Sequence, residues 1–125
     1  MCVFCDLEKT FKNDRVLFST PNWIAVYDYY PVTKGHVLLI PKQHYETFFD
    51  LPDDLKESIH YRINDVKEII DKKFKPDGYN IGCNCGETAG QTINHFHLHI
   101  IPRYKGDCEN PRGGVRGVIP SKQSY

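Results

Sequence analysis

The stretch TINHFHLHIIPRY, residues Thr92–Tyr104, places a histidine at each of three alternate positions, 95, 97 and 99. The positions after each histidine are apolar: Phe96, Leu98 and Ile100. Because successive side chains of a strand point to opposite faces, the histidines are predicted to share one face and the apolar residues the other. The stretch therefore predicts a β-strand whose apolar face packs on a helix and whose imidazoles line a second surface.

Four further strands are predicted before this one. Residues 15–20 and 22–28 are short runs rich in β-branched and aromatic residues, and the turn signal at Pro21 indicates a β-hairpin between them. Residues 35–42 form a nearly continuous apolar run, which is typical of a central strand. Residues 79–84 predict another strand, followed by a loop that contains glycines.

A long amphipathic helix is predicted between these strands. Apolar residues recur at spacings of three and four on one helical face: Leu55, Ile59, Ile63, Val66, Ile70 and Phe74. Acidic residues before this stretch and lysines at its end suit the two helix termini. The predicted fold class is α+β, a small antiparallel five-stranded sheet with one long helix packed on it. Residues 1–125 are predicted to form a single domain, of which 103–125 are an irregular tail rich in glycine and proline.

Composition restricts the classes of function. The 125 residues are 40% hydrophobic and 26% charged with a formal net charge of zero, as expected for one soluble globular domain. Zero net charge argues against unspecific nucleic-acid binding, and no apolar run reaches the length of a membrane span. The start of the chain resembles no secretory leader, and five cysteines favour a reducing compartment. We expect a cytoplasmic protein that binds neither nucleic acid nor membrane.

The spacing of the three histidines limits what they can share. Strand side chains two residues apart are separated by roughly 7 Å, and those four apart by roughly 13 Å, so one ion cannot bind all three without distortion. Cys2 and Cys5 form a C-x2-C pair, and with His44 and one strand histidine they make a possible tetrahedral Cys2His2 zinc site. From these residues alone, a structural metal, a catalytic metal and plain surface histidines all stay open.

Two segments resemble the histidine-triad (HIT) family of nucleotide hydrolases and transferases. They are residues 27–44, YDYYPVTKGHVLLIPKQH, and residues 90–103, GQTINHFHLHIIPR. The family signature is His-φ-His-φ-His-φ-φ, in which φ is apolar, and residues 95–101 satisfy every position. The resemblance runs from about Cys2 to Arg103, and it implies the HIT-like fold and a homodimer.

The resemblance also implies roles for particular residues. His97 would attack the α-phosphate of a nucleotide and form a nucleotidyl-histidine that water hydrolyses, since a neutral imidazole is a good nucleophile near neutral pH. His99 would donate to the phosphate or leaving group, and His36 would flank the nucleophile. The other implied contacts are Gln91, Thr92 and the amides around Gly90 to phosphate oxygens, Asp28 and Asn84 to the ribose, and Val26 beneath the base.

Members of the family with an N-terminal C-x2-C use it to bind structural zinc. The resemblance therefore implies one structural zinc per chain, held by Cys2, Cys5, His44 and His95. The three histidines of the opening stretch are then expected to have different jobs.

The substrate stays open between two classes of purine nucleotide. Residues 102–107, PRYKGD, favour the branch of the family that cleaves dinucleoside polyphosphates of the Ap4A type, but that branch lacks the C-x2-C start; nucleoside phosphoramidates are the other class. Arg112 and Arg116 in the tail are placed to reach a polyphosphate chain, or the tail packs on the sheet edge or a dimer partner. The alternative to an enzyme is a nucleotide-binding regulatory module with little turnover.

Overall fold

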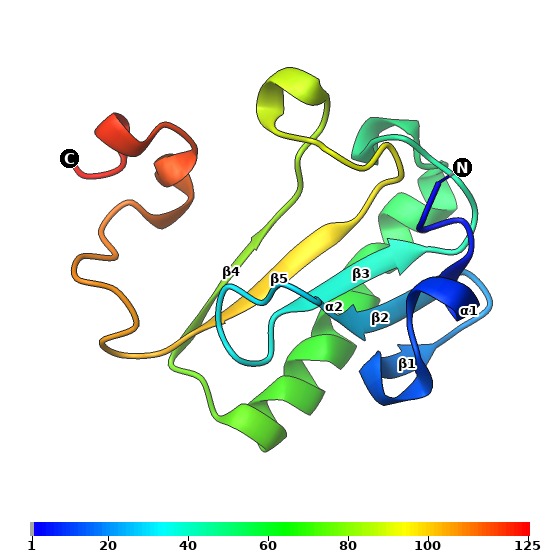
Figure 1. Cartoon of the computed structure of the whole chain (residues 1–125), viewed down its shortest axis with the longest axis horizontal. Coiled ribbons are helices and arrows are strands. Elements are labelled where there is room, and N and C mark those ends of the chain that lie inside the picture. The colour runs from blue at the N-terminus through cyan, green and yellow to red at the C-terminus, as the bar shows by residue number, and fades with distance from the viewer. Residues whose placement is uncertain (1) are drawn as a thin grey trace.

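The computed structural model describes residues 2–125 and contains one five-stranded sheet with strand order β1-β2-β3-β5-β4 (Figure 1). All neighbouring strands are antiparallel. The strands are β1 (Val16–Ser19), β2 (Trp23–Tyr27), β3 (Val37–Pro41), β4 (Gly78–Gly82) and β5 (Leu98–Arg103). The long helix α2 (Asp53–Phe74) crosses one face of this sheet. The predicted α+β architecture is confirmed.

The sheet has a different core on each face. On the face of α2, alternate sheet residues such as Val37 and Leu39 pack with the helix, and Phe96, Leu98 and Ile100 belong to the same cluster. On the other face, Leu38 and Ile40 pack against the N-terminal segment and its short helix α1 (Leu7–Thr10), through Phe4, Leu7 and Phe11. Central strand β3 is consequently buried along its whole length. The N-terminal segment covers only the β1–β3 part of its face, as Figure 1 shows.

The predicted apolar stripe of the helix is its buried side. Leu55, Ile59, Val66 and Ile70 are buried, and Ile63 and Phe74 pack partly buried against the same cluster. Asp53 and Asp54 lie in the first turn and Lys72 and Lys73 in the last, where their charges complement the helix dipole. Within residues 2–125, no helix is long and apolar enough to cross a membrane.

Two segments differ from their predicted form. Strand β5 begins at Leu98, so of the three histidines only His99 lies in the strand, although the alternation of buried apolar residues extends back to Phe96. The tail contains two 3₁₀ helices, η4 (Gly114–Val118) and η5 (Pro120–Lys122). It begins with an ordered contact, because Arg103 pairs with Asp107 at 2.8 Å and donates to Asn80 of β4 at 2.7 Å.

Candidate active site and metal centre

A cleft of about 560 Å³ lies on the sheet face opposite α2. Six of the residues implied for nucleotide binding line it: Asp28, Asn84, Gly90, Thr92, His97 and His99. They come from the end of β2, the segment after β4, the glycine loop and the histidine segment. We call this hollow the nucleoside cleft. The fold therefore gathers chemistry-bearing residues that are up to 71 positions apart, between Asp28 and His99, on one surface.

His97 is held in one tautomer by the backbone. Its Nδ1 lies 2.9 Å from the carbonyl oxygen of His95, and a carbonyl only accepts hydrogen bonds. Nδ1 therefore carries the proton in the neutral ring, and Nε2 keeps its lone pair. The ring also stands edge-on against Phe4, with centroids 5.1 Å apart. These two contacts fix a nucleophilic nitrogen on a ring that lines the nucleoside cleft.

His36 and His99 form a directed chain of hydrogen bonds. The backbone N–H of Val32 donates to His36 Nδ1 at 3.0 Å, so the proton of the neutral His36 ring is on Nε2. That Nε2–H lies 2.9 Å from His99 Nδ1, which must accept. In His99 the proton is then on Nε2, which is free to donate into the cleft. One backbone amide thus sets the tautomers of two side chains in series.

Burial keeps this pair neutral. Desolvation, with smaller contributions from the neighbouring His97 and His36, lowers the pKa of His99 to about 4. Desolvation also lowers the pKa of His36, which is 2% exposed, while the Asp28 carboxylate 3.6 Å away opposes the shift. At neutral pH both His36 and His99 are therefore uncharged, and His99 acts as a hydrogen-bond donor.

Gly35 sets the position of His36. Its backbone φ is +86°, a conformation that favours glycine, and a Cβ there would lie 3.0 Å from the Phe74 ring at the end of α2. The close approach between this turn and the helix brings His36 to the position just before β3, where its ring contacts His99. Gly35 therefore helps to position the imidazole of His36 in the site.

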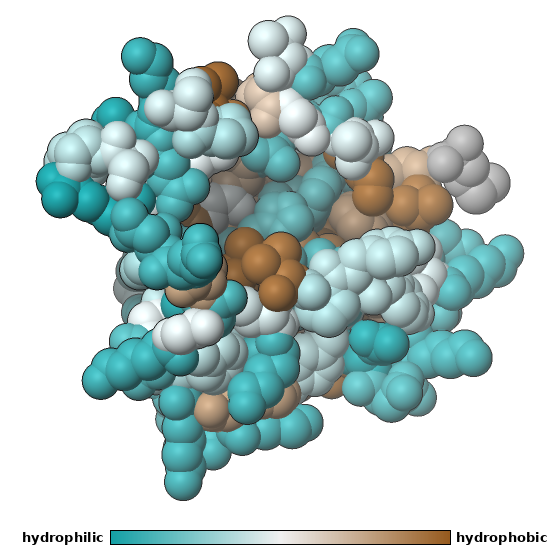
Figure 2. Space-filling model, turned by 60° about the vertical axis from the view of Figure 1, so that its left-hand side comes forward, coloured by the Kyte–Doolittle hydropathy of each residue, from teal (hydrophilic) through white to brown (hydrophobic). Residues whose placement is uncertain are grey.

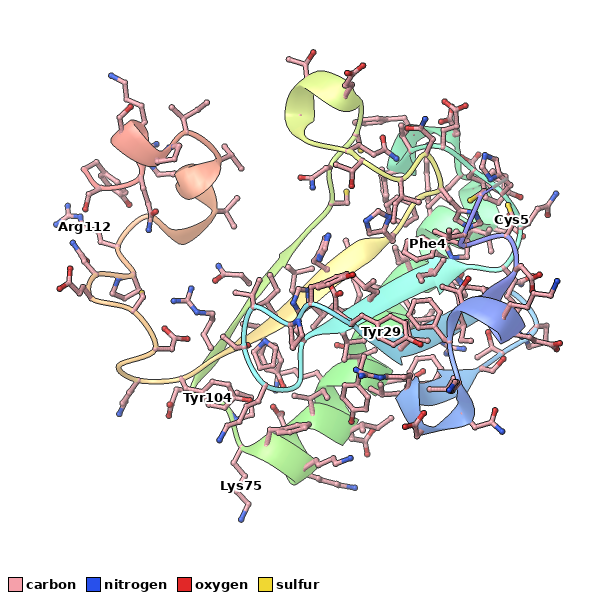
Figure 3. All side chains as sticks on the ribbon, in the orientation of Figure 1. Phe4, Cys5, Tyr29, Lys75, Tyr104 and Arg112 are labelled. Carbon is pink, nitrogen blue, oxygen red and sulfur yellow. The ribbon has the colours of Figure 1, made fainter. Side chains whose placement is uncertain are left out.

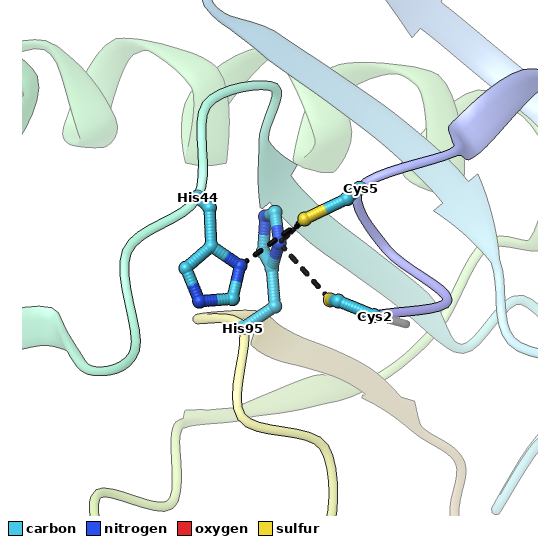
Figure 4. A group of neighbouring side chains, drawn as sticks. All are labelled: Cys2, Cys5, His44 and His95. Carbon is cyan, nitrogen blue, oxygen red and sulfur yellow. Dashed lines mark hydrogen bonds between the residues drawn. The ribbon is translucent and has the colours of Figure 1, made fainter.

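A second cluster of polar side chains lies beside the nucleoside cleft. Cys2, Cys5, His44 and His95 bring their Sγ and Nδ1 atoms within 4.8 Å of one another (Figure 4). Cys5 Sγ is 3.1 Å from His44 Nδ1, and both sulfurs are 3.5 Å from His95 Nδ1. In a tetrahedral zinc site, with Zn–S bonds of about 2.3 Å and Zn–N bonds of about 2.0 Å, a sulfur and a nitrogen ligand lie about 3.5 Å apart.

The donor set and its surroundings fit zinc. His95 is fully buried, and its Nε2–H donates to the carbonyl oxygen of Pro41 at 2.8 Å. This bond leaves the lone pair on Nδ1, the atom that faces the cysteines, as in protein zinc sites whose ligand histidines are oriented from behind. Thiolate and imidazole are also the ligands that zinc prefers in closed structural sites.

A second group with three potential metal ligands is Asp28, His36 and His99. Here the ring atoms already bond to one another and to the Val32 amide. His36 Nε2 carries a proton and offers no lone pair to an ion. The geometry therefore argues against a catalytic metal at this position.

The structure places two implied site residues behind the cleft wall. Val26 is fully buried in the core under the N-terminal segment. Gln91 is 7% exposed, and its amide binds the backbone: Oε1 accepts from Gly86 N, and Nε2 donates to the carbonyls of Glu46 and Ile93. Gln91 thus holds the glycine loop in shape with both ends of its side chain.

Aromatic residues that sequence reasoning missed form one wall of the cleft. Phe4, Phe11 and Tyr29 line it, and the rings of Phe11 and Tyr29 stack with centroids 5.4 Å apart. Figure 3 shows Phe4 and Tyr29 on the sheet face away from α2. The sequence did contain one signal for this wall. Phe4 lies between Cys2 and Cys5, so it must lie close to any metal site that these two cysteines form.

Comparisons with known proteins agree with this geometry. The HIT domain profile matches residues 9–106. An uncharacterized HIT-like protein of Methanocaldococcus jannaschii is 44% identical over 121 residues, which cover 94% of this chain and 92% of that protein. A crystal structure of a zinc-bound histidine-triad family protein from Mycobacterium smegmatis superposes with a TM-score of 0.75 at 32% identity, covering 85% of this chain and 77% of that one.

Two relatives are named as nucleotide hydrolases. Adenylylsulfatase of Arabidopsis thaliana is 34% identical over 107 residues, which cover 86% of this chain and 54% of that protein. The asymmetrical bis(5′-nucleosyl)-tetraphosphatase of Schizosaccharomyces pombe is 36% identical over 93 residues, which cover 74% and 51%. The chain belongs to the HIT family, a family that includes hydrolases of nucleotides.

Proposed function

We propose that this protein is a nucleotide hydrolase that cleaves at the α-phosphate through a nucleotidyl intermediate on His97. The observation that carries the proposal is the bond between His97 Nδ1–H and the His95 carbonyl at 2.9 Å. It leaves the Nε2 lone pair on a ring that lines a cleft large enough for a nucleoside monophosphate. A fixed tautomer in such a cleft is what a histidine nucleophile requires.

The reaction has two displacements. In the first, the Nε2 lone pair of His97 forms a P–N bond to the α-phosphorus, and the bond to the leaving group breaks with its electron pair. Positive charge that develops on the ring strengthens the Nδ1–H bond to the His95 carbonyl. In the second, water attacks the same phosphorus, the P–N pair returns to Nε2, and the nucleoside monophosphate leaves with the oxygen of water.

His99 and His36 serve the phosphate in this scheme. The free Nε2–H of His99 donates to an oxygen of the phosphate or leaving group, where negative charge grows in the transition state. His36 acts as a positioning residue, because its Nε2–H keeps His99 in the donating tautomer. Thr92 and the amides around Gly90 bind further phosphate oxygens, and Gln91 keeps that loop in shape.

The nucleoside lies along the aromatic wall. Phe4, Phe11 and Tyr29 offer flat apolar surface to a purine base. One oxygen of Asp28 accepts from Tyr30 N at 2.9 Å, and the carboxylate is 15% exposed, so its second oxygen serves the ribose together with Asn84. Val26 supports this wall from the core instead of touching the base.

One structural zinc per chain is part of the proposal. Cys2, Cys5, His44 and His95 would hold it, and with four protein ligands it would supply a cross-link between the N-terminal segment and the histidine segment. The cross-link also positions the nucleophile, since it anchors the residue whose carbonyl orients His97. A homodimer stays a prediction from the family resemblance, and sedimentation of the purified protein tests it. A cytoplasmic location stays a prediction from the cysteine count and the N-terminal sequence.

Hydrolysis in ¹⁸O-labelled water tests the proposed chemistry. Dinucleoside polyphosphates and nucleoside phosphoramidates are the substrates, and products are identified by mass. We expect one ¹⁸O atom in the nucleoside monophosphate and none in the leaving group. Label in a β-phosphate would contradict attack at the α-phosphate. Tight binding of nucleotide with product release slower than spontaneous hydrolysis would identify a regulatory module instead.

A further inference from the structure

Two cysteines lie close together beside the candidate active site. The Sγ atoms of Cys83 and Cys85 are 3.9 Å apart, and both side chains are partly buried free thiols. Side chains two residues apart on an extended strand are separated by roughly 7 Å, so these two converge. They follow the end of β4 and are separate from the four residues proposed to hold zinc. The chain therefore contains a pair of thiols to which the proposed function gives no role.

The pair borders the surface on which a nucleotide is proposed to bind. Asn84, between the two cysteines, lines the nucleoside cleft and also a second hollow of about 440 Å³ between the sheet and the tail. Cys83 and His99 line this second hollow as well. Figure 2, in which the tail side is turned forward, shows this face of the molecule hollowed near its middle. A chemical change in the pair is therefore a change next to Asn84.

The backbone is anchored on both sides of the pair. Gly82, at the end of β4, is the register partner of His99 in β5. Gly86 is bonded to Gln91 in both directions: its N–H donates to Oε1 at 2.8 Å, and its carbonyl accepts from the backbone N–H of Gln91 at 3.1 Å. The three residues between these anchors, 83–85, therefore have to absorb any change in the distance between the two sulfurs.

A disulfide would change that distance. An S–S bond is about 2.05 Å long, so the sulfurs of Cys83 and Cys85, 3.9 Å apart as thiols, would approach by about 1.9 Å. Because the anchors on either side hold their positions, this movement falls on the short segment between them. Asn84 is the middle residue of that segment, and its side chain would be displaced at the edge of the nucleoside cleft.

We propose that Cys83 and Cys85 form a dithiol modification site, which a small-molecule disulfide such as glutathione disulfide oxidises to an intramolecular disulfide. The new bond displaces Asn84 and weakens the binding of a nucleoside monophosphate. Formation of the disulfide is independent of the proposed function, whereas its effect on nucleotide binding rests on that function.

Thiol–disulfide exchange forms the bond in two steps. Burial, with smaller contributions from Cys85, raises the pKa of Cys83 to about 11, so Cys83 holds its proton near neutral pH and Cys85 attacks first. The Cys85 thiolate bonds to one sulfur of the small disulfide, and the other sulfur leaves with the electron pair and takes up a proton. Cys83 then loses its proton, attacks the Cys85 sulfur and releases the second small thiol. In sum, two protein thiols are oxidised and one small disulfide is reduced to two thiols.

Peptide masses after treatment with glutathione disulfide test the site. The tryptic peptide that ends at Arg103 contains Cys83 and Cys85 and no other cysteine. We expect this peptide to lose two hydrogens, to resist alkylation, and to regain both hydrogens with dithiothreitol. Cys83→Ser should instead carry one glutathione on Cys85, because the second step is removed. Cys108→Ser, a change at an exposed cysteine of the tail, is the matched control and should behave as the wild type.

Nucleotide binding measures the consequence of oxidation. Once free glutathione is removed, calorimetry compares the binding of AMP to the reduced and the oxidised protein. We expect oxidation to raise the Kd for AMP about 10-fold, the effect of losing one hydrogen bond. The double variant Cys83→Ser, Cys85→Ser should bind AMP equally well before and after the treatment. Asn84→Ala should bind AMP about 10-fold more weakly in both states, while its two cysteines still form the disulfide.

The outcomes separate the dithiol site from the proposed function. A peptide that keeps both thiols, or that becomes linked to a second copy of the chain, would overturn the dithiol site. A disulfide that forms without any change in the Kd for AMP would overturn the displacement of Asn84. If the reduced protein bound no AMP, the proposed function and the effect on binding would both fall, and the peptide mass would still decide whether the dithiol site exists.

Discussion

The molecule holds two histidine clusters that each take one residue from the segment 95–99, and they differ in where the protons of their imidazole rings lie. In the cluster of Cys2, Cys5, His44 and His95, called here the metal cluster, the Pro41 carbonyl accepts a hydrogen bond from His95 Nε2–H. This bond leaves the Nδ1 lone pair open toward the cysteines. In the cluster of Asp28, His36 and His99, called here the triad cluster, the Val32 N–H donates a hydrogen bond to His36 Nδ1. The ring proton of His36 is therefore on Nε2, which donates to His99. A carbonyl behind the ring leaves a lone pair that can bind a metal ion, whereas an amide behind the ring leaves an N–H that can donate to a neighbouring imidazole.

The contrast teaches that donor atoms close in space do not by themselves define a metal site. Both clusters have at least three potential ligand atoms within 4.8 Å of one another. The backbone group behind each ring decides whether a lone pair or a proton faces the centre. His97 shows the third outcome, in which a carbonyl accepts a hydrogen bond from Nδ1–H and the lone pair stays on Nε2 of a ring that lines the nucleoside cleft.

The largest expected effect is on turnover. His97→Ala should lower kcat at least ~10³-fold, because the nucleophile is removed, and should leave the bound metal in place. His60→Ala is the matched control, a change of the same residue type at an exposed position on α2. Steady-state hydrolysis and metal analysis on both variants check the prediction. Turnover near the wild-type rate would remove His97 from its role.

The next effect is on metal content and stability. His44→Ala should reduce zinc well below one per chain and lower Tm by about 10 °C, since a structural metal stabilises the fold directly. His36→Ala should not change the zinc content, because His36 lies outside the group formed by Cys2, Cys5, His44 and His95. Elemental analysis of protein purified without chelator checks both. Equal zinc loss in the two variants would erase the distinction between the clusters.

Acid stability offers a smaller effect on the triad side. Folding lowers the pKa of His99 from 6.5 to about 4, so the unfolded chain binds a proton more readily. The stability that neutral His99 contributes is complete above about pH 6.5 and is lost as pH falls toward 4, on the order of 3 kcal/mol.

His99→Asn should remove this part of the acid loss. Urea unfolding at pH 7, 5.5 and 4 measures it, with chelator in every sample so that metal release is the same throughout. Every other ionisable group is the same in both proteins, so the difference between their pH slopes reports on His99 alone. Identical pH slopes would show that His99 is not buried in its neutral form.

The smallest effect concerns the backbone that carries His36. Gly35→Ala should destabilise the fold by about 1–3 kcal/mol, because alanine is strained at φ +86° and its Cβ crowds Phe74. Gly78→Ala, where no atom lies within 4 Å of the added Cβ, should change stability far less. Denaturant unfolding compares the two. Equal losses would mean that the Gly35 turn does not hold the triad in place.

Local pattern was enough to predict the fold. The apolar stripe of α2 and the continuous run of β3 are periodic signals, and both elements formed where expected. The start of β5 was not predictable, because the alternation of apolar residues with histidines is already present at Phe96, before strand pairing begins at Leu98.

Residues of the candidate site could be proposed from the sequence only where residue type carries the chemistry. His97, His99 and the four metal-cluster residues were named from motif and resemblance. The aromatic wall and the backbone role of Gln91 were not, since both depend on contacts between segments far apart in the chain. The tautomers could not be predicted either, because backbone groups of Pro41 and Val32 set them.

The most direct test of the account is the mass of the protein caught during turnover. Wild-type protein is mixed with a nucleotide substrate and denatured at alkaline pH, which preserves a P–N bond on histidine. We predict an added mass of one nucleoside monophosphate, mapped by peptide fragmentation to His97, with zinc present before denaturation. Attachment of the nucleotide to His95 or His99, or a metal ion shown spectroscopically on the His97 ring, would contradict the division between the clusters.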